Sequence, residues 1–172
     1  MDQRNIQSRT AIKKALITLS KNRPYSEISI RELCREAGIS RSTFYNNYRF
    51  FNDVLEEMSE DFMKVVEGQG LSRGFFDTVI AHSDEMRLLL KSGIFGQKFS
   101  LYLKNLLMGD KDLTGVRNQE ELSLNVKTLY HAYGIFGVLI NLIDNSGSPY
   151  FDQMYATGIE TLMELIRDFT EE

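Results

Sequence analysis

Apolar residues recur at helical spacing along most of the chain. In residues 8–22 they fall at Ile12, Ala15, Leu16 and Leu19, the spacing of one buried helical face. The same periodicity, interrupted by polar or glycine-containing breaks, predicts further helices at residues 52–69, 71–82, 84–92, 96–108, 119–145 and 149–170. Only two prolines occur, which favours long helices. The fold is therefore predicted to be all-α.

Residues 29–49 predict two short helices joined by a tight turn. Ser29 and Glu32 have the spacing of a capping box, which starts the first helix. Gly38 stands where a left-handed residue ends a helix, and Ser40 then caps the second. Two short helices joined by a glycine-containing turn are typical of a helix-turn-helix, whose second helix enters the major groove of DNA.

The second of these helices carries side chains suited to DNA. Arg41 can bind a guanine through two hydrogen bonds or hold a phosphate, and Arg49 can hold a phosphate where the helix ends. Phe44 is expected to turn into the core. Other side chains of this helix can reach base edges or phosphates: Ser42, Thr43, Tyr45, Asn46 and Asn47. The alternative is a purely structural helical hairpin with a polar exterior.

The distribution of charge strengthens the DNA interpretation. The whole chain has a net charge of −4, which by itself argues against nucleic acid. Residues 1–51, however, hold ten Lys or Arg against four Asp or Glu, a net charge of +6. Residues 52–172 hold ten against twenty, a net charge of −10. A basic first third on an acidic remainder is expected when one end of a protein meets phosphates.

Amino-acid composition narrows the classes of protein to which the chain can belong. Cys34 is the single cysteine, which fits a reducing cytoplasm, and with His82 and His131 far apart no metal site or cofactor is predicted. No signal peptide is expected, because the first ten residues lack an apolar run. The longest apolar stretch, residues 135–143, is shorter than the ~20 residues of a membrane span, so no membrane partner is expected. Without a nucleophile–base pair or phosphate loop, the chain is not expected to be an enzyme.

The run AGISRSTFYNNYR, with the helix before it, resembles the DNA-binding domain of TetR/AcrR-type transcriptional regulators over residues 6–58. The matching elements are Ser29-Ile30, residues 37–40 and residues 42–45. The resemblance implies an N-terminal three-helix helix-turn-helix domain. It implies base contacts from Ser42, Thr43 and Asn46. It also implies phosphate contacts from Tyr45, Asn47 and the starts of the flanking helices, which here supply Ser29 and Arg31.

One departure from the family pattern follows the second helix. Phe50 and Phe51 occupy the positions where the family has a polar cap and a lysine. Phenylalanine can neither cap a helix nor neutralise a phosphate. Asn52 is the nearest substitute cap, so the next helix is expected to begin one or two residues late. The phosphate contact at this edge is expected to be weaker, or to be made by Arg49.

In the remainder of the chain, SDEMRLLLKSGIFGQKFSLYL followed by YHAYGIFGVLINLI resembles the C-terminal domain of one branch of the same family. The resemblance implies a DNA-binding domain at residues 1–51 and an α-helical effector-binding and dimerisation domain at residues 52–172. The last helix has a heptad-like seam that suits another helix, at Tyr155, Ile159, Leu162 and Ile166. The resemblance implies that this seam forms a homodimer interface, and the alternative is that it only closes the monomer core. The resemblance also implies an effector pocket, expected at Phe62, Phe95, Phe99, Tyr102 and Tyr133, although aromatic residues at helical spacing are more often core.

The predicted function is that of a cytoplasmic, homodimeric transcriptional regulator on a palindromic double-stranded DNA operator. An unknown small-molecule effector would change its DNA affinity, and the resemblance favours a repressor over an activator. The alternative is a helical protein–protein adaptor that keeps the fold without binding DNA, for which Phe50 and Phe51 are the best support.

Overall fold

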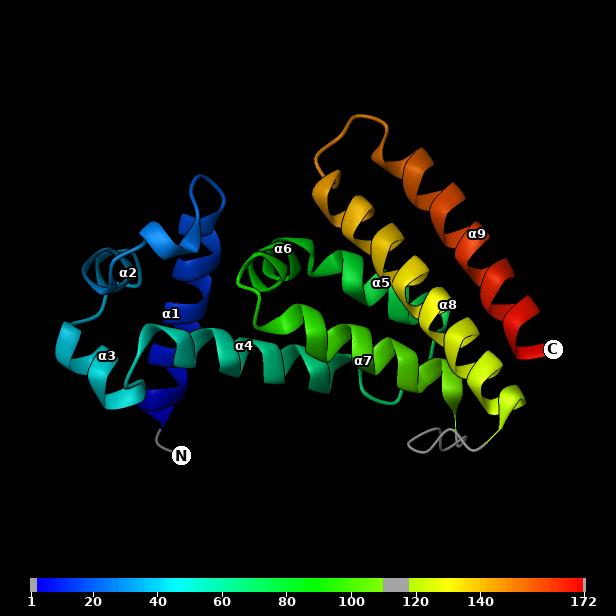
Figure 1. Cartoon of the computed structure of the whole chain (residues 1–172). Coiled ribbons are helices and arrows are strands. Elements are labelled where there is room, and N and C mark those ends of the chain that lie inside the picture. Colours follow the sequence, from blue (N-terminus) through cyan, green and yellow to red (C-terminus); the bar gives the residue numbers. More distant parts are fainter. Residues whose placement is uncertain (1–2, 110–117, 172) are drawn as a thin grey trace. The chain divides into compact units, whose positions relative to one another are not determined.

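The computed structural model describes residues 3–109 and 118–171, and over these ranges the chain is helical without any strand (Figure 1). The prediction of an all-α fold is confirmed. The elements are α1 Gln3–Ser20, the 3-10 helix η1 Tyr25–Glu27, α2 Ile30–Glu36, α3 Arg41–Asn47, α4 Phe51–Val66, α5 Arg73–Ala81, α6 Ser83–Lys91, α7 Phe95–Met108, α8 Gln119–Asp144 and α9 Phe151–Glu171.

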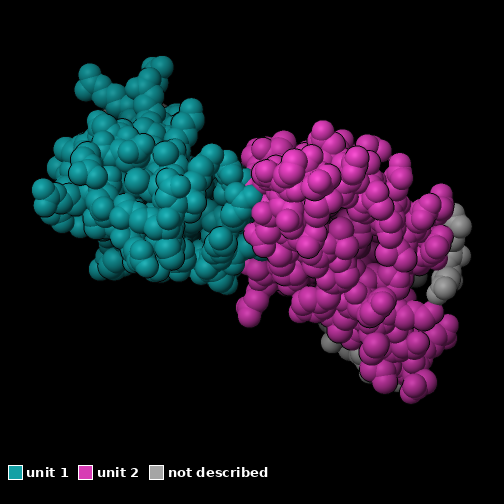
Figure 2. Space-filling view, turned by 90° about the horizontal axis from the view of Figure 1, so that it is seen from above, with its two compact units in different colours: residues 1–65, 84–95 teal, residues 66–83, 96–172 magenta. Residues whose placement is uncertain are grey.

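The chain forms two compact units (Figure 2). Unit 1 comprises Met1–Val65 and Asp84–Phe95, and so holds α1 to α4 together with α6. Unit 2 comprises Val66–Ser83 and Gly96–Glu172, and so holds α5 and α7 to α9. Unit 1 is discontinuous because the chain returns to it with α6. The functional boundary expected at residue 51 falls inside unit 1.

The core of unit 1 is formed by the apolar stripes of its helices. Ile12 and Leu16 of α1 are fully buried where α1 packs against α2 and α3. Leu33 of α2 and Phe44 of α3 are also fully buried. Each such side chain contributes about 1.5–3 kcal/mol through its removal from water. These contacts hold the two short helices of the helix-turn-helix, which are too short to be stable alone.

The core of unit 2 combines an aromatic cluster with the α8–α9 pair. The ring of Phe75 in α5 lies 6.2 Å from that of Phe99 in α7, and both side chains are fully buried. Helices α8 and α9 pack against each other along much of their length (Figure 1). Ile135 and Leu139 of α8 are buried, as is Ile159 of α9.

The seam predicted as a dimer interface lies inside unit 2. Ile159 is 0% exposed, Leu162 is 1% exposed and Ile166 is 9% exposed in the single chain. Tyr155 is half-buried and donates a hydrogen bond to Asp77 of α5. The seam therefore packs within its own chain. A contact between copies through these four side chains stays a prediction.

A different face of α8 exposes large apolar side chains to solvent. This α8 stripe consists of Leu122, Val126, Leu129, Tyr130 and Tyr133, of which Tyr130 is 77% exposed. Helix α8 is long and apolar enough, by length and composition alone, to cross a membrane. The sequence expectation considered only residues 135–143 and missed this. Core helices of soluble proteins meet the same criterion, so it is weak evidence for a membrane span.

Candidate nucleic-acid interface

A reciprocal capping box starts α2, as predicted. The Ser29 hydroxyl oxygen accepts a hydrogen bond from the Glu32 amide at 3.3 Å, and the Glu32 carboxylate accepts one from the Ser29 amide at 3.0 Å. The carboxylate also accepts a 2.7 Å hydrogen bond from the Ser29 hydroxyl. That hydroxyl bond, followed by the backbone bond and the Arg23 side chain, lowers the pKa of Glu32 to about 2. The capping carboxylate is therefore ionised at neutral pH.

The turn between α2 and α3 is a Schellman motif. The Ile39 amide donates to the Cys34 carbonyl at 3.0 Å, and the Gly38 amide donates to the Arg35 carbonyl at 3.3 Å. Gly38 has a φ of +66°, a conformation that costs other residues about 1–2 kcal/mol. Ser40 then caps α3 by accepting a 3.0 Å hydrogen bond from the Thr43 amide. The glycine-ended helix and the serine cap predicted from the sequence are both confirmed.

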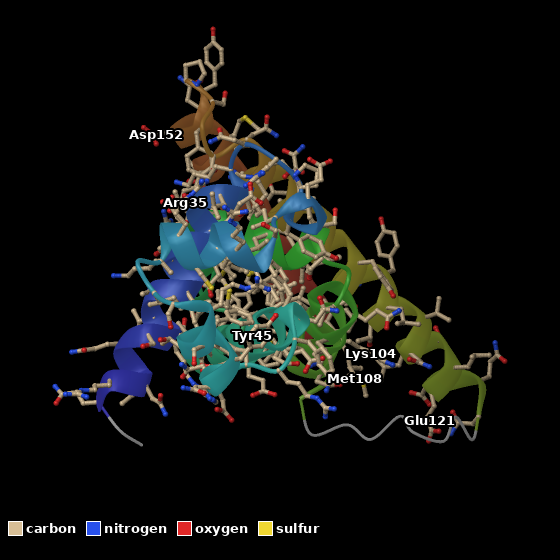
Figure 3. All side chains as sticks on the ribbon, turned by 90° about the vertical axis from the view of Figure 1, so that its left-hand side faces the viewer. Arg35, Tyr45, Lys104, Met108, Glu121 and Asp152 are labelled. Atoms are coloured by element: carbon tan, nitrogen blue, oxygen red, sulfur yellow. The ribbon has the colours of Figure 1, made fainter. Side chains whose placement is uncertain are left out.

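Helix α3 separates its side chains into an inner and an outer face. Phe44 is fully buried and Tyr48, just beyond the helix, is 4% exposed. Tyr45 on the outer face is 50% exposed, and Figure 3 shows it on the side of unit 1 that faces the viewer. The predicted DNA-binding side chains that are exposed are Ser29, Arg31, Arg41, Ser42, Tyr45, Asn46 and Arg49. Two others, Thr43 and Asn47, are half-buried.

Asn47 is engaged within the protein. Its amide nitrogen donates to the Thr43 carbonyl at 2.8 Å, and its side-chain oxygen accepts from Nε of Arg9 at 3.3 Å. Arg9 also donates to the Asn47 carbonyl at 3.3 Å, and its guanidinium lies 5.1 Å from the centre of the Tyr48 ring. Asn47 therefore joins the end of α3 to α1, and a phosphate contact from it stays a prediction.

Four ionised side chains join α1 to α4. Arg9 lies 2.5 Å from Glu57, and Lys13 lies 2.6 Å from Glu57 and 2.5 Å from Asp61. Burial alone would lower the pKa of Lys13, but the two carboxylates outweigh it and raise that pKa. Burial would likewise raise the pKa of Asp61, but the hydrogen bond and charge of Lys13 lower it. We call these four residues the α1–α4 ion cluster.

The apolar periodicity does not reveal this cluster, because Arg9 and Lys13 lie off the apolar stripe of their helix and would be expected to face solvent. The same holds for Glu57 and Asp61 of α4. A usable signal was present: both pairs have i, i+4 spacing, so each pair lies on one helical face and can meet the other. Two of the bases in the positive first third are thus neutralised by α4, which weakens the charge argument but leaves Arg31, Arg41 and Arg49 exposed.

Helix α4 begins at Phe51 without the predicted delay. The Asp53 carboxylate, rather than Asn52, accepts hydrogen bonds from the Arg49 and Phe50 amides, each at 2.8 Å. Phe51 is half-buried, with its ring 6.4 Å from that of Tyr25. Phe50 is 59% exposed, and the Arg49 guanidinium lies 5.1 Å from its ring centre. Arg49 thus stands at the exit of α3 over an aromatic ring.

The five side chains predicted to line an effector pocket are divided between the two units. Phe62 and Phe95 pack edge to face in the core of unit 1, 5.7 Å apart. Phe99 and Tyr102 stack in unit 2, 6.4 Å apart, and the Tyr102 hydroxyl donates to the Val66 carbonyl at 2.9 Å. Tyr133 is 60% exposed on α8. Phe62, Phe95 and Phe99 are fully buried. An effector pocket lined by the five side chains stays a prediction.

Comparison with known proteins shows a partial similarity to a curated regulator. No family model matches the chain. A curated relative from Bacillus subtilis (strain 168), the uncharacterized HTH-type transcriptional regulator YxbF, is 32% identical over 77 residues. The match covers 45% of this chain and 19% of the relative, so the chain matches about a fifth of the relative's length. Over less than half of its length, the chain is similar to an HTH-type transcriptional regulator.

Proposed function

We propose that the chain is a sequence-specific, DNA-binding transcriptional regulator of the TetR/AcrR type, acting as a homodimeric repressor. The observation that carries the proposal is the outer face of α3, where Arg41, Tyr45 and Asn46 are exposed above a buried Phe44. The capping box and the Schellman turn fix the direction of that helix. The similarity to an HTH-type regulator supports the same class of function.

Residues 1–51 would bind DNA through two kinds of contact. Base edges would be read by Arg41, Ser42, Thr43 and Asn46, because bidentate or short polar side chains discriminate bases in the major groove. Phosphates would be held by Ser29, Arg31, Tyr45, Asn47 and Arg49. A cytoplasmic protein of this kind needs two copies to read a palindrome, with the recognition helices about 34 Å apart.

The second copy would bind on the α8 stripe. Val126 is 58% exposed and Tyr130 is 77% exposed, an unusual amount of apolar surface on one helical face. Gly137 extends the same face, and a Cβ placed there meets no atom within 4 Å, so another backbone can approach closely. Unit 2, within residues 52–172, would thus supply the dimer, and an unidentified small-molecule effector would change its DNA affinity.

A salt titration with DNA fragments chosen by genomic selection tests this function. The logarithm of the affinity should fall with the logarithm of salt concentration, with a slope of about −0.9 per neutralised phosphate. Arg41→Ala should relax base preference at a cost of about 1–3 kcal/mol. Lys98→Ala, which removes an exposed cation in unit 2, is the matched control. Failure to select any sequence would refute the proposal.

A helical adaptor is the second candidate, favoured by the exposed ring of Phe50. An adaptor would show no selected sequence, and Phe50→Ser would abolish capture of its protein partner. The regulator instead predicts that Phe50→Ser leaves sequence preference intact.

A further inference from the structure

A cavity of about 390 Å³ opens in unit 1 between the end of α1, η1 and one face of α6. We call it the α6 cavity. From α6 it is lined by Asp84, Arg87, Leu88 and Lys91, which have the i, i+3, i+4, i+7 spacing of a single helical face. The opposite wall includes Lys21, Arg23, Pro24 and Tyr25. Its volume lies at the small end of the range for ligand pockets, about 300–1,000 Å³.

The wall of the α6 cavity is strongly cationic. Lys21, Arg23, Arg87 and Lys91 face Asp84, the lone carboxylate among the lining residues. Asp84 accepts from both Lys21, at 2.7 Å, and Arg87, at 3.1 Å. The hydrogen bond from Lys21 lowers the pKa of Asp84, so this carboxylate stays ionised between its two cations. Lys91 is exposed and forms no ion pair with any residue that the structure describes.

Arg23 connects the α6 cavity to the helix-turn-helix. Arg23 lies 3.1 Å from Glu32, the carboxylate that caps α2. With Glu32 included, these four cations and two carboxylates carry a net charge of +2. The ring of Tyr25 lies against Phe51, where α4 begins. Two walls of the cavity therefore touch the first turns of α2 and α4.

We propose that the α6 cavity binds a small organic anion carrying phosphate or carboxylate groups, and that this ligand alters the DNA affinity of the helix-turn-helix. The anionic groups would lie between Lys91, Arg87 and Arg23, and a short apolar part would cover the exposed Pro24 beside the buried Leu88. The anion would compete with Glu32 for Arg23. A weaker Arg23–Glu32 pair loosens the start of α2, where Ser29 and Arg31 are placed against phosphates.

The effect of the anion on DNA affinity rests on the proposed function, whereas the binding of the anion to the α6 cavity does not. A duplex phosphate is a less suitable occupant, because a concave site of this size encloses a small molecule better than it meets the convex backbone of DNA. If Lys91 contacted DNA, its loss would weaken DNA binding without any added anion.

Binding of pyrophosphate and of citrate to the full chain tests the site, each measured by isothermal titration calorimetry at constant ionic strength. We expect saturable binding of at least one probe with one site per chain. Lys91→Gln should weaken that binding about tenfold, because a charge-assisted hydrogen bond is lost. Lys14→Gln removes an exposed cation of the same unit outside the cavity and should leave binding unchanged. Circular dichroism confirms that both variants fold.

Two results would overturn the site: no saturation by either probe, or equal weakening by Lys91→Gln and Lys14→Gln. Coupling is then measured as DNA affinity with and without the saturating probe, against sodium chloride of equal ionic strength. The probe should change the affinity of the wild type but not of Lys91→Gln. Weaker DNA binding by Lys91→Gln without any probe would overturn the proposal in favour of a phosphate contact. Saturable anion binding by a chain that binds no DNA would leave the site standing and refute the proposed function alone.

Discussion

Glu57→Gln removes the carboxylate that two cations of α1 share, and its effect can be estimated from the structure. Glu57 pairs with Arg9 and Lys13 at 2.5 and 2.6 Å, and the three side chains are only 19–26% exposed. Exposed ion pairs contribute about 0–1 kcal/mol, whereas loss of one partner of a buried pair costs about 3–5 kcal/mol. Partial exposure places this cluster between the two ranges, and Asp61 still pairs with Lys13. We expect a loss of about 1–2 kcal/mol.

Urea denaturation of the full chain, followed by circular dichroism and tyrosine fluorescence, measures this loss. Glu56→Gln makes the same chemical change at the exposed neighbouring position and should stay within about 0.5 kcal/mol of the wild type. A double-mutant cycle with Lys13→Gln should give a coupling energy of about 1 kcal/mol. High salt should reduce it only in part, because half-buried charges are screened less than exposed ones. Additive effects of the two substitutions would show that the pair does not stabilise the protein.

Four further predictions concern other parts of the structure. Gly38→Ala should destabilise by about 1–2 kcal/mol through its left-handed φ alone, since no atom lies within 4 Å of the added Cβ; an unchanged urea midpoint would contradict this. The Glu32 carboxyl should titrate near pH 2 by NMR rather than near 4.5, and the depressed pKa means that its stabilisation is present above pH 4.5 and is lost as pH falls toward 2. Ile159→Ala should destabilise the fold by about 2–5 kcal/mol, because it empties part of the core. Val126→Asp should leave the fold intact but give monomers in analytical ultracentrifugation, and unchanged dimers would place the interface elsewhere.

Local patterns in the sequence predicted local structure well. The capping box at Ser29, the turn at Gly38 and the helices of unit 2 were all predicted within a few residues, because each depends on neighbours in the chain. The start of α4 was not predicted correctly. The Arg49 and Phe50 amides donate to Asp53, the third residue of the helix, rather than to a side chain at the cap position. The prediction considered only the residues at the cap position, and it therefore placed the start of α4 too late.

The side-chain partners could not be predicted in the same way. A seam at Ile159 and Leu162 indicates that another helix packs there, but periodicity does not show whether that helix belongs to the same chain. The ion cluster likewise depends on how α1 and α4 cross, which no single segment specifies. The exposed stripe of α8 was hidden for a related reason: an apolar residue looks the same in a sequence whether it is buried or exposed.

The two hydrogen bonds to Asp53 bear on the thermodynamics of DNA recognition. Only residues 48–50 separate α3 from α4; the first of these is buried, and the backbone amides of the other two are held by the same carboxylate. The recognition helix therefore has little freedom to reorient independently of α4. Ordering a mobile segment on binding costs conformational entropy, and a helix fixed beforehand avoids most of that cost. If α3 reads DNA as proposed, pre-organisation at Asp53 is a source of affinity that requires no additional contact with DNA.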